Sequence, residues 1–436
     1  MNRTALIAAH FLRARWRWRA LRGPRLDRYR ERHARAIVAF TRAHSPFYAA
    51  HWRGHDLANW LSLPPVDKGL MMTHFDAFNT RGIGRAAAES VALAAERSRD
   101  FRPTIGDLTV GLSSGTSGHR GLFLVGPWES AAWAGTILAR TLTPRLGPTR
   151  VAFFLRANSN LYEGLGGRLV RFRFFDLMAP LAGSIAALNT FAPHFIVGPP
   201  SLLGLLADAR EAGQLRARPE RLLAVAETLE PQDRARLEGV FATPVGQIYQ
   251  CTEGLLAISC AHGALHVQED LVALQYEPLP GDAGRVTPLV TDLWRRTQPM
   301  IRYRLNDVLR LDPAPCPCGS PFQVIAAVEG RRDDLCYFLD PDGTPRPFFP
   351  DTIRRAILFA AAPIADYRAT QERPGQLHVA LALPPETPFA PVAAVVHASM
   401  IDTVTGYGCQ PPALTITAGI APEEAGTKRR RVRRLG

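Results

Sequence analysis

Short apolar runs that alternate with amphipathic segments are the feature that most constrains the fold of this 436-residue chain. Such alternation is typical of α/β proteins with buried parallel strands. From residue 108 onward the pattern predicts strands at Leu108–Leu112, Val151–Leu155, His194–Val197, Leu222–Ala226 and Gln247–Tyr249, and helices at Ser130–Leu142, Ser184–Phe191, Ser201–Ala212 and Pro231–Val240.

The pattern changes twice further along the chain. Residues 264–330 hold short strands separated by turns, which predicts an antiparallel sheet or small barrel. A smaller α+β segment follows. We therefore expect an α/β fold with a large N-terminal body of several subdomains over residues 1–332, containing parallel sheets, and a smaller, mobile α+β C-terminal domain over residues 333–436.

The formal charge of +13 is concentrated at the two ends of the chain. Residues 1–54 carry +11, residues 428–436 carry +6, and residues 55–427 carry −4. The Arg-rich segment 1–54 has a helical pattern broken at Gly23-Pro24, and we expect it to pack on the body; contact with an anionic membrane surface is the alternative. Because a basic groove would have to come from the ends alone, a nucleic-acid partner is not expected.

The apolar runs of the sequence are short. None approaches the roughly 18–20 residues of a membrane-spanning helix, so we expect no integral membrane segment. The first nine residues offer no convincing cleavage site, and six Cys in so long a chain indicate a reducing compartment. We therefore expect a cytoplasmic protein, and the sequence leaves a homodimer open.

A serine- and glycine-rich segment directly follows the first predicted strand. The nine residues 113–121, Ser-Ser-Gly-Thr-Ser-Gly-His-Arg-Gly, contain three Gly and four hydroxyl side chains. Backbone N–H groups and hydroxyls of such a loop can bind a polyphosphate, although a flexible surface loop has the same composition. The segment lacks the Gly-Lys-Ser/Thr ending of the Walker loop, which excludes that family.

Polar residues also gather at the ends of later strands. The segment Tyr249–Gly254 offers an aromatic face for a base, a hydroxyl for a phosphate and a carboxylate for Mg²⁺. Further on, Asp292 and Asp307 flank Ile301-Arg302-Tyr303-Arg304, and an aspartate at a strand end is suited to bind two ribose hydroxyls.

In this order and spacing, the motifs resemble the superfamily of adenylate-forming enzymes, and most closely its phenylacetate–coenzyme A ligase-like branch. The resemblance covers nearly the whole chain, from Ser45-Pro46-Phe47-Tyr48 and residues 63–68, Leu-Pro-Pro-Val-Asp-Lys, to Lys428. The Ser/Gly segment and the Tyr-x-x-Thr-Glu element are signals of the superfamily. The Ile-Arg-Tyr-Arg motif with Asp307, followed by Cys316-Pro317-Cys318-Gly319, is typical of the branch.

The resemblance implies ATP and Mg²⁺ as cofactors and assigns a role to each motif residue. The ATP phosphates would be held by Ser113, Ser114, Gly115, Thr116, Ser117 and Gly118. The adenine would be lined by Ala226, Glu227, Thr228 and Tyr249, and the ribose hydroxyls would be bound by Asp307 and Arg331. Thr252 would contact the α-phosphate and Glu253 would ligate Mg²⁺, while Asp333 would be the hinge between the domains.

Lys428 matches the family lysine that reaches the carboxylate and the α-phosphate as the acyl-adenylate forms. Only two of the 52 basic residues are lysines, Lys68 and Lys428. A compact, mobile ammonium suits charge that develops on a phosphoryl group, whereas a merely basic tail would be expected to have Arg at this position too.

Two segments depart from the family pattern. His119-Arg120 stands where the family usually has Lys-Pro or a similar pair. Residues 335–339 do not form the usual Gly-containing loop that helps admit coenzyme A, and a hairpin-like Asp-Pro-Asp-Gly follows at 340–343. The adenylation half of the reaction is therefore expected to be intact, while the acceptor stays open.

A separate set of residues suggests a metal site. Cys260, His266, Cys316 and Cys318 bracket the predicted antiparallel sheet and form a three-Cys, one-His set of the kind that structural zinc sites use. His262 is a competing ligand. Reduced cysteines without a metal and a disulfide are the alternatives.

The sequence thus favours an AMP-forming acid–thiol ligase. It would activate a carboxylic acid, aromatic or otherwise hydrophobic, as the acyl-adenylate with release of pyrophosphate, and pass the acyl group to coenzyme A or a carrier protein. Transfer to an amine, which would make an amide, and a nucleotide-binding homologue without turnover are the alternatives.

Overall fold

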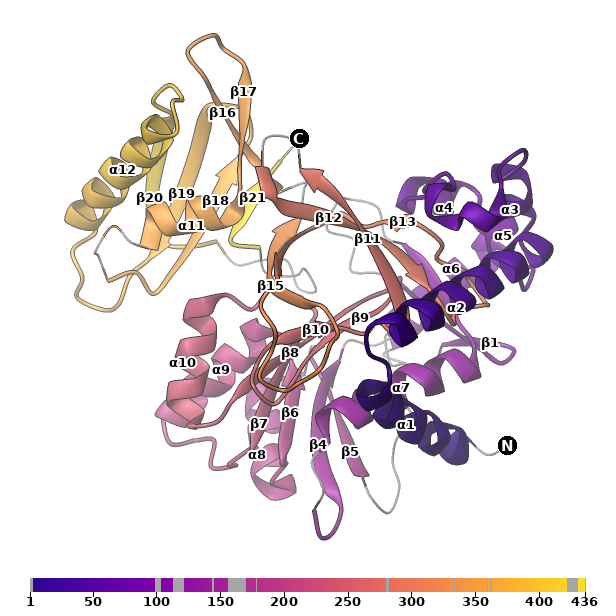
Figure 1. Cartoon of the computed structure of the whole chain (residues 1–436). Coiled ribbons are helices and arrows are strands. Elements are labelled where there is room, and N and C mark those ends of the chain that lie inside the picture. Colours follow the sequence, from indigo (N-terminus) through magenta and orange to yellow (C-terminus); the bar gives the residue numbers. More distant parts are fainter. Residues whose placement is uncertain are drawn as a thin grey trace. The chain divides into compact units, whose positions relative to one another are not determined.

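The protein is described here from a computed structural model of the whole chain (Figure 1). The structure describes residues 3–98, 103–112, 121–142, 145–155, 170–177, 179–279, 282–331, 334–358, 360, 363–421 and 430–435. The chain divides into two compact units: a large one of residues 1–305 and 310–327, and a small one of residues 306–309 and 328–436.

Helices form the N-terminal part of the large unit. They are α1 (Arg3–Ala20), α2 (Pro24–His44), α3 (Pro46–His51), a 3-10 helix η1 (Leu57–Ser62), α4 (Lys68–Thr73), α5 (Phe75–Phe78) and α6 (Arg85–Ser98). Gly23, with φ 46°, separates α1 from α2, and Pro24 opens α2, which is the predicted break. The side chains of Ser45 and Asp67 accept hydrogen bonds from the first turns of α3 and α4.

The expected packing of the Arg-rich segment on the body is observed. Helix α1 crosses α7 (Pro127–Thr141) at Gly135, where a Cβ atom would lie 2.6 Å from the Cβ of His10 and 2.8 Å from the carbonyl oxygen of Ile7. Only glycine allows the two helices to approach this closely.

The largest sheet is mixed, and most of its residues belong to the large unit. Its strands include β4 (Thr149–Leu155), β5 (Val170–Asp176), β6 (Phe195–Gly198), β7 (Arg221–Val225), β8 (Val245–Cys251), β9 (Gly254–Ser259), β10 (Leu265–Val267), β11 (Val272–Leu279), β12 (Asp282–Asp292), β13 (Tyr303–Arg304), β14 (Asp307–Asp312) and β15 (Val324–Arg331). The strand order is β11-β12-β14-β15-β10-β9-β8-β7-β6-β4-β5, and β13 pairs with β12. Strands β5, β4, β6, β7 and β8 are parallel, and β9 and β10 continue antiparallel.

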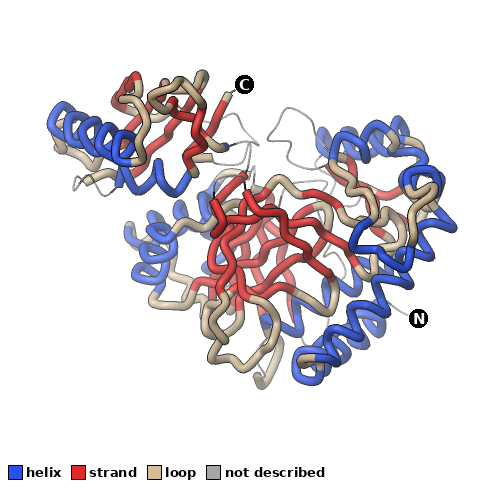
Figure 2. The backbone as a smooth tube through the Cα atoms, turned by 45° about the horizontal axis from the view of Figure 1, so that its top comes forward, coloured by secondary structure: helices blue, strands red, loops and turns tan. Residues whose placement is uncertain are grey.

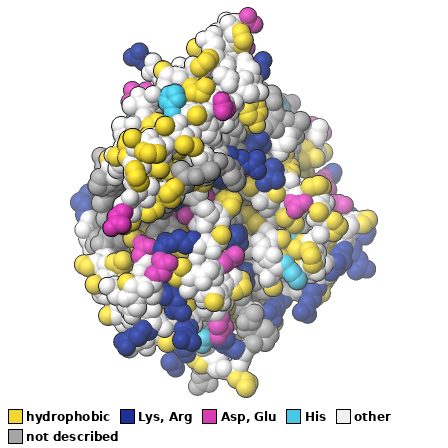
Figure 3. All heavy atoms as spheres, turned by 90° about the vertical axis from the view of Figure 1, so that its left-hand side faces the viewer, with side chains coloured by type: hydrophobic (Ala, Val, Ile, Leu, Met, Phe, Trp, Pro, Cys, Tyr) yellow, Lys and Arg dark blue, Asp and Glu magenta, His cyan; other side chains and the backbone are white. Residues whose placement is uncertain are grey.

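Three helices cover one face of the parallel strands, as expected for an α/β unit (Figures 1 and 2). They are α8 (Leu181–Phe191), α9 (Pro200–Glu211) and α10 (Pro231–Phe241). Their apolar side chains share one core with the strands, which includes Ala152, Phe154, Leu188, Ile196, Leu203, Leu206, Leu222 and Leu237. Figure 3 shows basic and acidic side chains interspersed on the outer face that carries these helices, where Arg236 pairs with Asp208 and Glu211.

One predicted strand is not part of this sheet. Residues 108–112 form β2 (Leu108–Leu112) in a separate antiparallel sheet with β1 (Thr104–Ile105) and β3 (Leu122–Val125). Leu112 pairs with Leu122, so the serine- and glycine-rich segment joins two strands of a hairpin. The expectation that this strand belongs to the parallel sheet was therefore wrong.

The small unit has its own core. Strands β16 (Cys336–Leu339) and β17 (Pro345–Phe348) form the predicted hairpin, and β18 (Asp366–Gln371), β19 (Gln376–Ala382), β20 (Ala413–Ala418) and β21 (Val432–Arg434) form a sheet in the order β20-β19-β18-β21. Helices α11 (Pro350–Leu358) and α12 (Phe389–Gly406) pack in the same core.

Helix α12 is long and apolar enough, by length and composition alone, to cross a membrane. It departs in this respect from the expectation that no apolar run approaches that length. Its side chains Val392, Val396, Met400 and Val404, four residues apart, are buried in the core of the small unit. This spacing is that of an amphipathic helix of a folded domain.

Candidate active site

The carboxyl ends of the parallel strands bring two predicted motifs to one edge of the sheet. Strand β7 ends at Val225 and leads into Ala226–Thr228, and the adjacent parallel strand β8 ends at Cys251 and leads into Thr252 and Glu253. In open α/β sheets, ligands bind outside the carboxyl ends of the strands. The predicted adenine and α-phosphate residues are therefore placed side by side.

Glu227 has a structural partner at this edge. Its Oε2 accepts a hydrogen bond of 3.1 Å from the backbone N–H of Ser201, in the first turn of α9. A carboxylate at this position satisfies one of the free N–H groups of the helix start and complements its dipole. Ala226, before it, has the left-handed φ of 69°, a conformation that costs about 1 kcal/mol or more for a residue other than glycine.

The turn between β8 and β9 carries the predicted α-phosphate and magnesium residues. Oγ1 of Thr252 and Oε2 of Glu253 lie 2.9 Å apart, at hydrogen-bonding distance. The carbonyl oxygen of Thr252 accepts a hydrogen bond from Nη1 of Arg295. A carboxylate oxygen is a typical ligand of Mg²⁺, and a hydroxyl can donate a hydrogen bond to a phosphate oxygen. The Glu253 side chain therefore fits a magnesium ion, and the Thr252 side chain fits a phosphate group.

Arg295 fixes this turn from within the core. Its side chain is fully buried, and its Nη2 donates to the carbonyl of Leu124 at 3.2 Å and to Oε1 of Gln298 at 2.9 Å. The guanidinium therefore ties the turn to β3 and to the segment after β12. The sequence did not single out Arg295, because one arginine among so many carries no distinguishing signal.

Asp292 orients the backbone around Arg295. Its Oδ1 accepts hydrogen bonds from the backbone N–H groups of Trp294 at 2.9 Å and Arg295 at 3.0 Å. Burial raises the pKa of Asp292 to about 6, and the charge of Glu129 adds to the rise, whereas Arg295 and the two N–H groups oppose it. The same Glu129 accepts from the N–H groups of residues 296 and 297 at 2.6 Å each, which holds the segment from both sides.

Tyr303 lies beside Glu253. Burial raises the pKa of the Tyr303 hydroxyl well above its usual value, and the negative charges of Glu253, Cys251 and Asp67 raise it further. Tyr303 therefore stays neutral, next to a carboxylate at the strand end. Two motifs that are about 50 residues apart, one from β8 and one from β13, thus meet in the large unit.

The N-terminal motifs join the same region. The backbone N–H of Val66 donates to the carbonyl of Arg302 at 3.2 Å, and the N–H of Arg304 donates to the carbonyl of Val66 at 2.7 Å. The hydroxyl of Tyr48 donates to the carbonyl of Pro299 at 3.1 Å. Motifs that the sequence could relate only by resemblance are therefore brought together by hydrogen bonds to the backbone.

Several predicted site residues lie outside this description. Ser113, Ser114, Gly115, Thr116, Ser117, Gly118, Asp333 and Lys428 lie outside the described residues, and the side chain of Arg331 is not described. Asp307 and Arg331 belong to the small unit, as the first residue of β14 and the last residue of β15. Their roles stay predictions.

The predicted metal ligands come together at another place in the large unit. The ligand atoms of Cys260, His266, Cys316 and Cys318 all lie within 4.8 Å of one another. Sγ of Cys260 lies 3.7 Å from Sγ of Cys316, and Sγ of Cys318 lies 3.3 Å from Nε2 of His266. The competing ligand His262 instead contributes its backbone N–H, which donates to Sγ of Cys260 at 3.3 Å.

Comparison with known proteins finds the same fold in solved structures. No known family matches the sequence, and no curated protein matches it. Solved structures do match: the fold, with its large mixed sheet and separate C-terminal domain, is that of the adenylate-forming enzymes.

Three solved structures illustrate the match. 2-Hydroxyisobutyryl-CoA ligase, in its postadenylation state in complex with 2-HIB-AMP, has a TM-score of 0.71 at 18% identity, over 96% of this chain and 91% of that one. The GH3.15 acyl acid amido synthetase has a TM-score of 0.61 at 12% identity, over 94% and 91%. The anthranilate CoA ligase AuaEII, in complex with anthranoyl-AMP, has a TM-score of 0.50 at 13% identity, over 73% and 65%.

Proposed function

We propose that this chain is an ATP-dependent, AMP-forming ligase that activates a carboxylic acid, aromatic or otherwise hydrophobic, and transfers the acyl group to a thiol. The observation that carries the proposal is the Thr252–Glu253 turn at the carboxyl end of β8, which Arg295 holds from the core. Two of the solved structures with this fold are CoA ligases, and they support the proposal by analogy.

The first half-reaction sets the roles of the residues. A carboxylate oxygen attacks the α-phosphorus of ATP, the new acyl–phosphate bond forms, and the bond to pyrophosphate breaks with the electron pair leaving on pyrophosphate. The Thr252 hydroxyl would donate to an α-phosphate oxygen, and Tyr249 would stack on the adenine. Glu253 would hold Mg²⁺, which when bound neutralises negative charge on the phosphates.

Lys428 would supply the mobile positive charge. In the small unit, Arg430 forms an ion pair with Asp334, so the segment that carries Lys428 ends beside the residue that follows the proposed hinge, Asp333. A rotation of the small unit about Asp333 would therefore carry Lys428 with it. Asp307 and Arg331 would bind the ribose hydroxyls.

We propose coenzyme A or a carrier protein as the acceptor, and a cytoplasmic location. All six cysteines are free of disulfides, which supports a reducing compartment. An amine acceptor is the second candidate, because the β16–β17 hairpin stands where the resembled ligases have a Gly-containing loop, and because the GH3.15 match is an amido synthetase.

ATP–pyrophosphate exchange across a panel of carboxylic acids tests the proposal. We expect exchange with at least one acid, and a loss of about 10²–10³-fold in Glu253→Gln and in both Lys428→Ala and Lys428→Arg. Glu253→Gln would weaken the magnesium site, and the two Lys428 variants would remove the mobile ammonium. Glu211→Gln, an exposed carboxylate on α9 that pairs with Arg236, is the matched control and should keep full exchange.

Absence of exchange with every acid in folded protein would refute the ligase. ATP binding that Lys428→Ala leaves unchanged, with no pyrophosphate formed, would identify a nucleotide-binding homologue without turnover. Product masses with coenzyme A, carrier protein or an amine separate the acceptors, because each adds the acyl group to a partner of different mass.

A further inference from the structure

We infer that one structural zinc ion is bound by four side chains of the large unit, those of Cys260, His266, Cys316 and Cys318, and that helices α1 and α2 are folded onto this metal site. The inference stands whether or not the chain is a ligase, because the four ligands lie away from the Thr252–Glu253 turn.

Two of the ligand distances fit a tetrahedral metal, and one of them excludes a disulfide between Cys260 and Cys316. Zinc–sulfur bonds of about 2.3 Å in a tetrahedron place two sulfurs about 3.8 Å apart, and a sulfur and a nitrogen about 3.5 Å apart. The Cys260–Cys316 sulfurs are 3.7 Å apart and the Cys318 sulfur is 3.3 Å from the His266 nitrogen. A disulfide would require about 2.05 Å.

The surroundings orient the ligands as second-shell contacts of zinc sites do. Nδ1 of His266 lies 2.8 Å from the carbonyl oxygen of Phe322, so Nδ1 carries the proton and Nε2 is the metal-binding nitrogen. Backbone N–H groups donate to two of the sulfurs: that of His262 to Cys260 at 3.3 Å, and that of Ser320 to Cys318 at 3.4 Å. Such N–H contacts orient the two sulfurs toward the remaining ligands.

Two turns of the same construction present the cysteines. In Cys260–Gly263 and in Cys316–Gly319, the carbonyl of the first residue accepts from the glycine N–H three residues later, at 3.1 and 3.0 Å. Both glycines have a positive φ, 82° and 72°, which explains why glycine occupies both positions. One turn joins β9 to β10 and the other lies between β14 and β15, so a metal would staple two parts of the sheet that are about 55 residues apart in sequence.

Strand β9 separates this site from the candidate active site. Glu253 precedes the first residue of β9 and Cys260 follows the last, so a strand of six residues, about 20 Å long, lies between them. Four protein ligands also complete the tetrahedral coordination of zinc and leave no open position for a substrate. Both observations point to a structural metal.

The corner between α1 and α2 rests on the metal-site loops. Nη1 of Arg22 donates to the carbonyl of Gly319 at 2.8 Å, one residue after a cysteine ligand. The ring of Trp18 meets the rings of His266 and Phe322 edge-on, at centroid distances of 5.2 and 5.0 Å. Leu21 and Leu26 share a buried cluster with Phe322.

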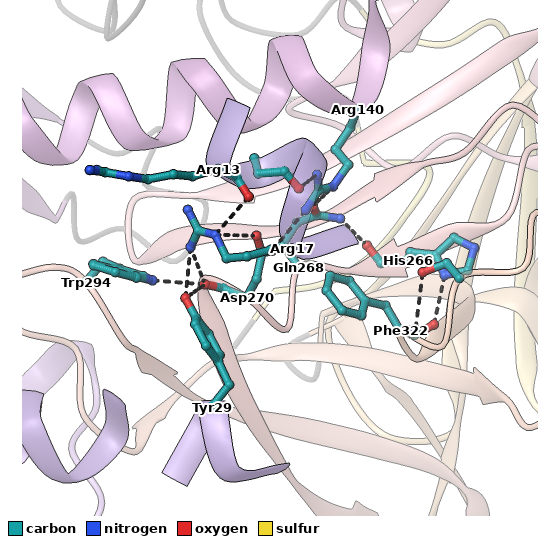
Figure 4. Close-up of polar contacts among 11 residues, drawn as sticks. Arg13, Arg17, Tyr29, Arg140, His266, Gln268, Asp270, Trp294 and Phe322 are labelled. Atoms are coloured by element: carbon teal, nitrogen blue, oxygen red, sulfur yellow. Dashed lines mark hydrogen bonds and ion pairs between the residues drawn. The ribbon is translucent and has the colours of Figure 1, made fainter. Parts of the chain in front are cut away.

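Arg140 of α7 completes the contact (Figure 4). Its guanidinium lies 4.5 Å from the ring of Trp18, donates to the carbonyl of Ala14 at 2.7 Å, and binds Oε1 of Gln268 at 2.9 Å, two residues after His266. A change in the position of His266 or Phe322 would therefore reach both N-terminal helices directly.

Metal analysis of the full chain, purified without a histidine tag and without chelator, tests the first half of the inference. We expect about one zinc per chain, and at least a 10-fold loss in His266→Gln and Cys318→Ser. Cys409→Ala, a buried cysteine of the small unit, is the matched control and should keep the metal. Wild-type protein with less than about 0.1 zinc per chain, or a Cys260–Cys316 disulfide found by mass after alkylation, would overturn the site.

Cobalt substitution tests the wild-type chain without any variant. Exchange of the metal for Co²⁺ should produce the visible absorption of a tetrahedral thiolate site. It should also quench the fluorescence of Trp18, and this part of the quenching should be missing when Trp18→Phe is compared with the wild-type protein. An octahedral cobalt spectrum, or the same quenching in Trp18→Phe, would contradict the proposed geometry.

Limited trypsin digestion tests the second half. Removal of zinc with a thiol-specific mercurial should expose the arginines of residues 1–54 and speed cleavage there at least 10-fold relative to cleavage in the small unit. Arg22→Ala should speed the same cleavage while keeping one zinc per chain. Unchanged cleavage after metal removal would show that the fold of helices α1 and α2 does not depend on the metal, and would refute the coupling.

Discussion

The most informative single perturbation of the fold is Asp270→Asn. Asp270 lies between β10 and β11, and its side chain is fully excluded from solvent. Its carboxylate lies 3.1 Å from Nη2 of Arg140 and 3.6 Å from Nε of Arg17, whose side chains are only 4% and 5% exposed (Figure 4). The substitution keeps the shape of the side chain and removes the only negative charge that these two contacts share.

The expected cost follows from what remains buried. Removing one partner of a buried ion pair typically costs about 3–5 kcal/mol, because the other charge is left without compensation. Here Arg140 keeps the carbonyl of Ala14 and Oε1 of Gln268, and Arg17 keeps the carbonyl of Asp270 and the hydroxyl of Tyr29. These contacts satisfy donors but supply no charge, so we expect a loss near the lower limit, about 3 kcal/mol.

A surface pair of the same composition provides the control. Nη2 of Arg236 lies 2.6 Å from the carboxylate of Asp208, but the two side chains are 43% and 59% exposed. Asp208→Asn should therefore cost less than about 1 kcal/mol despite the shorter distance. Arg236 also keeps its pair with Glu211, so the control combines exposure with a remaining carboxylate, and both keep the expected cost low.

Urea unfolding followed by tryptophan fluorescence is the assay. All seven tryptophans lie between residues 16 and 294, so the signal reports on the large unit alone. A loss of about 3 kcal/mol should lower the midpoint at unchanged slope. If Asp270→Asn destabilises the protein no more than Asp208→Asn does, the buried pair is not what holds α1 and α7 to the sheet.

Three further predictions concern the helices and the turn. Gly135→Ala should cost ~1–3 kcal/mol in the same assay, because the added Cβ would meet backbone atoms of α1 at 2.8 Å. Gly204→Ala, in open space on α9, is the control and should stabilise the protein by about 0.5–1 kcal/mol. The opposite order of the two effects would refute the close helix contact. Burial, with two nearby arginines, lowers the pKa of His10 from 6.5 to about 4, so folding stability should fall by up to ~3 kcal/mol as the pH drops from 6.5 to 4, and His10→Phe should flatten this part of the profile. Arg295→Met should lower pyrophosphate exchange about 10²-fold, with partial recovery in Arg295→Lys, because the turn at Thr252 loses its support; exchange at the wild-type rate would show that Arg295 does not position the turn.

Most helices and parallel strands could be predicted from the sequence, because the apolar residues that they bury recur at a regular spacing within each segment. Helix α10 was predicted at Pro231–Val240 and spans Pro231–Phe241, and α9 was predicted at Ser201–Ala212 and spans Pro200–Glu211. Strand β5 was missed, since Arg and Phe alternate in it and it follows a segment without pattern. It pairs with β4, where Phe175 stacks on Phe154 at 4.8 Å.

The candidate site could be predicted only where neighbouring residues in the sequence themselves indicate the chemistry. The Thr252–Glu253 turn could be expected because hydroxyl and carboxylate follow a strand directly. The sequence named His266 as the metal ligand, with His262 as its competitor, and the structure brings His266 together with the three cysteines. The pairing of β10 with β9 and β15 places His266 there, which no local pattern shows. Glu129 and Arg295 act through backbone groups distant in sequence, which no local pattern reveals.

The buried arginines Arg17 and Arg140 show why arginine suits these contacts. Arg17 donates to the carbonyl of Arg13 at 3.3 Å, to the hydroxyl of Tyr29 at 2.9 Å and to the carbonyl of Asp270 at 3.2 Å, and Arg140 likewise spans three acceptors. Only a planar guanidinium, with five N–H donors in a fixed fork, can reach acceptors in such different directions. Arginine is therefore the structural cation of these contacts. In the proposed ligase, Lys428 would have a different task, that of a mobile charge, for which the rigid guanidinium of Lys428→Arg would be a poor substitute.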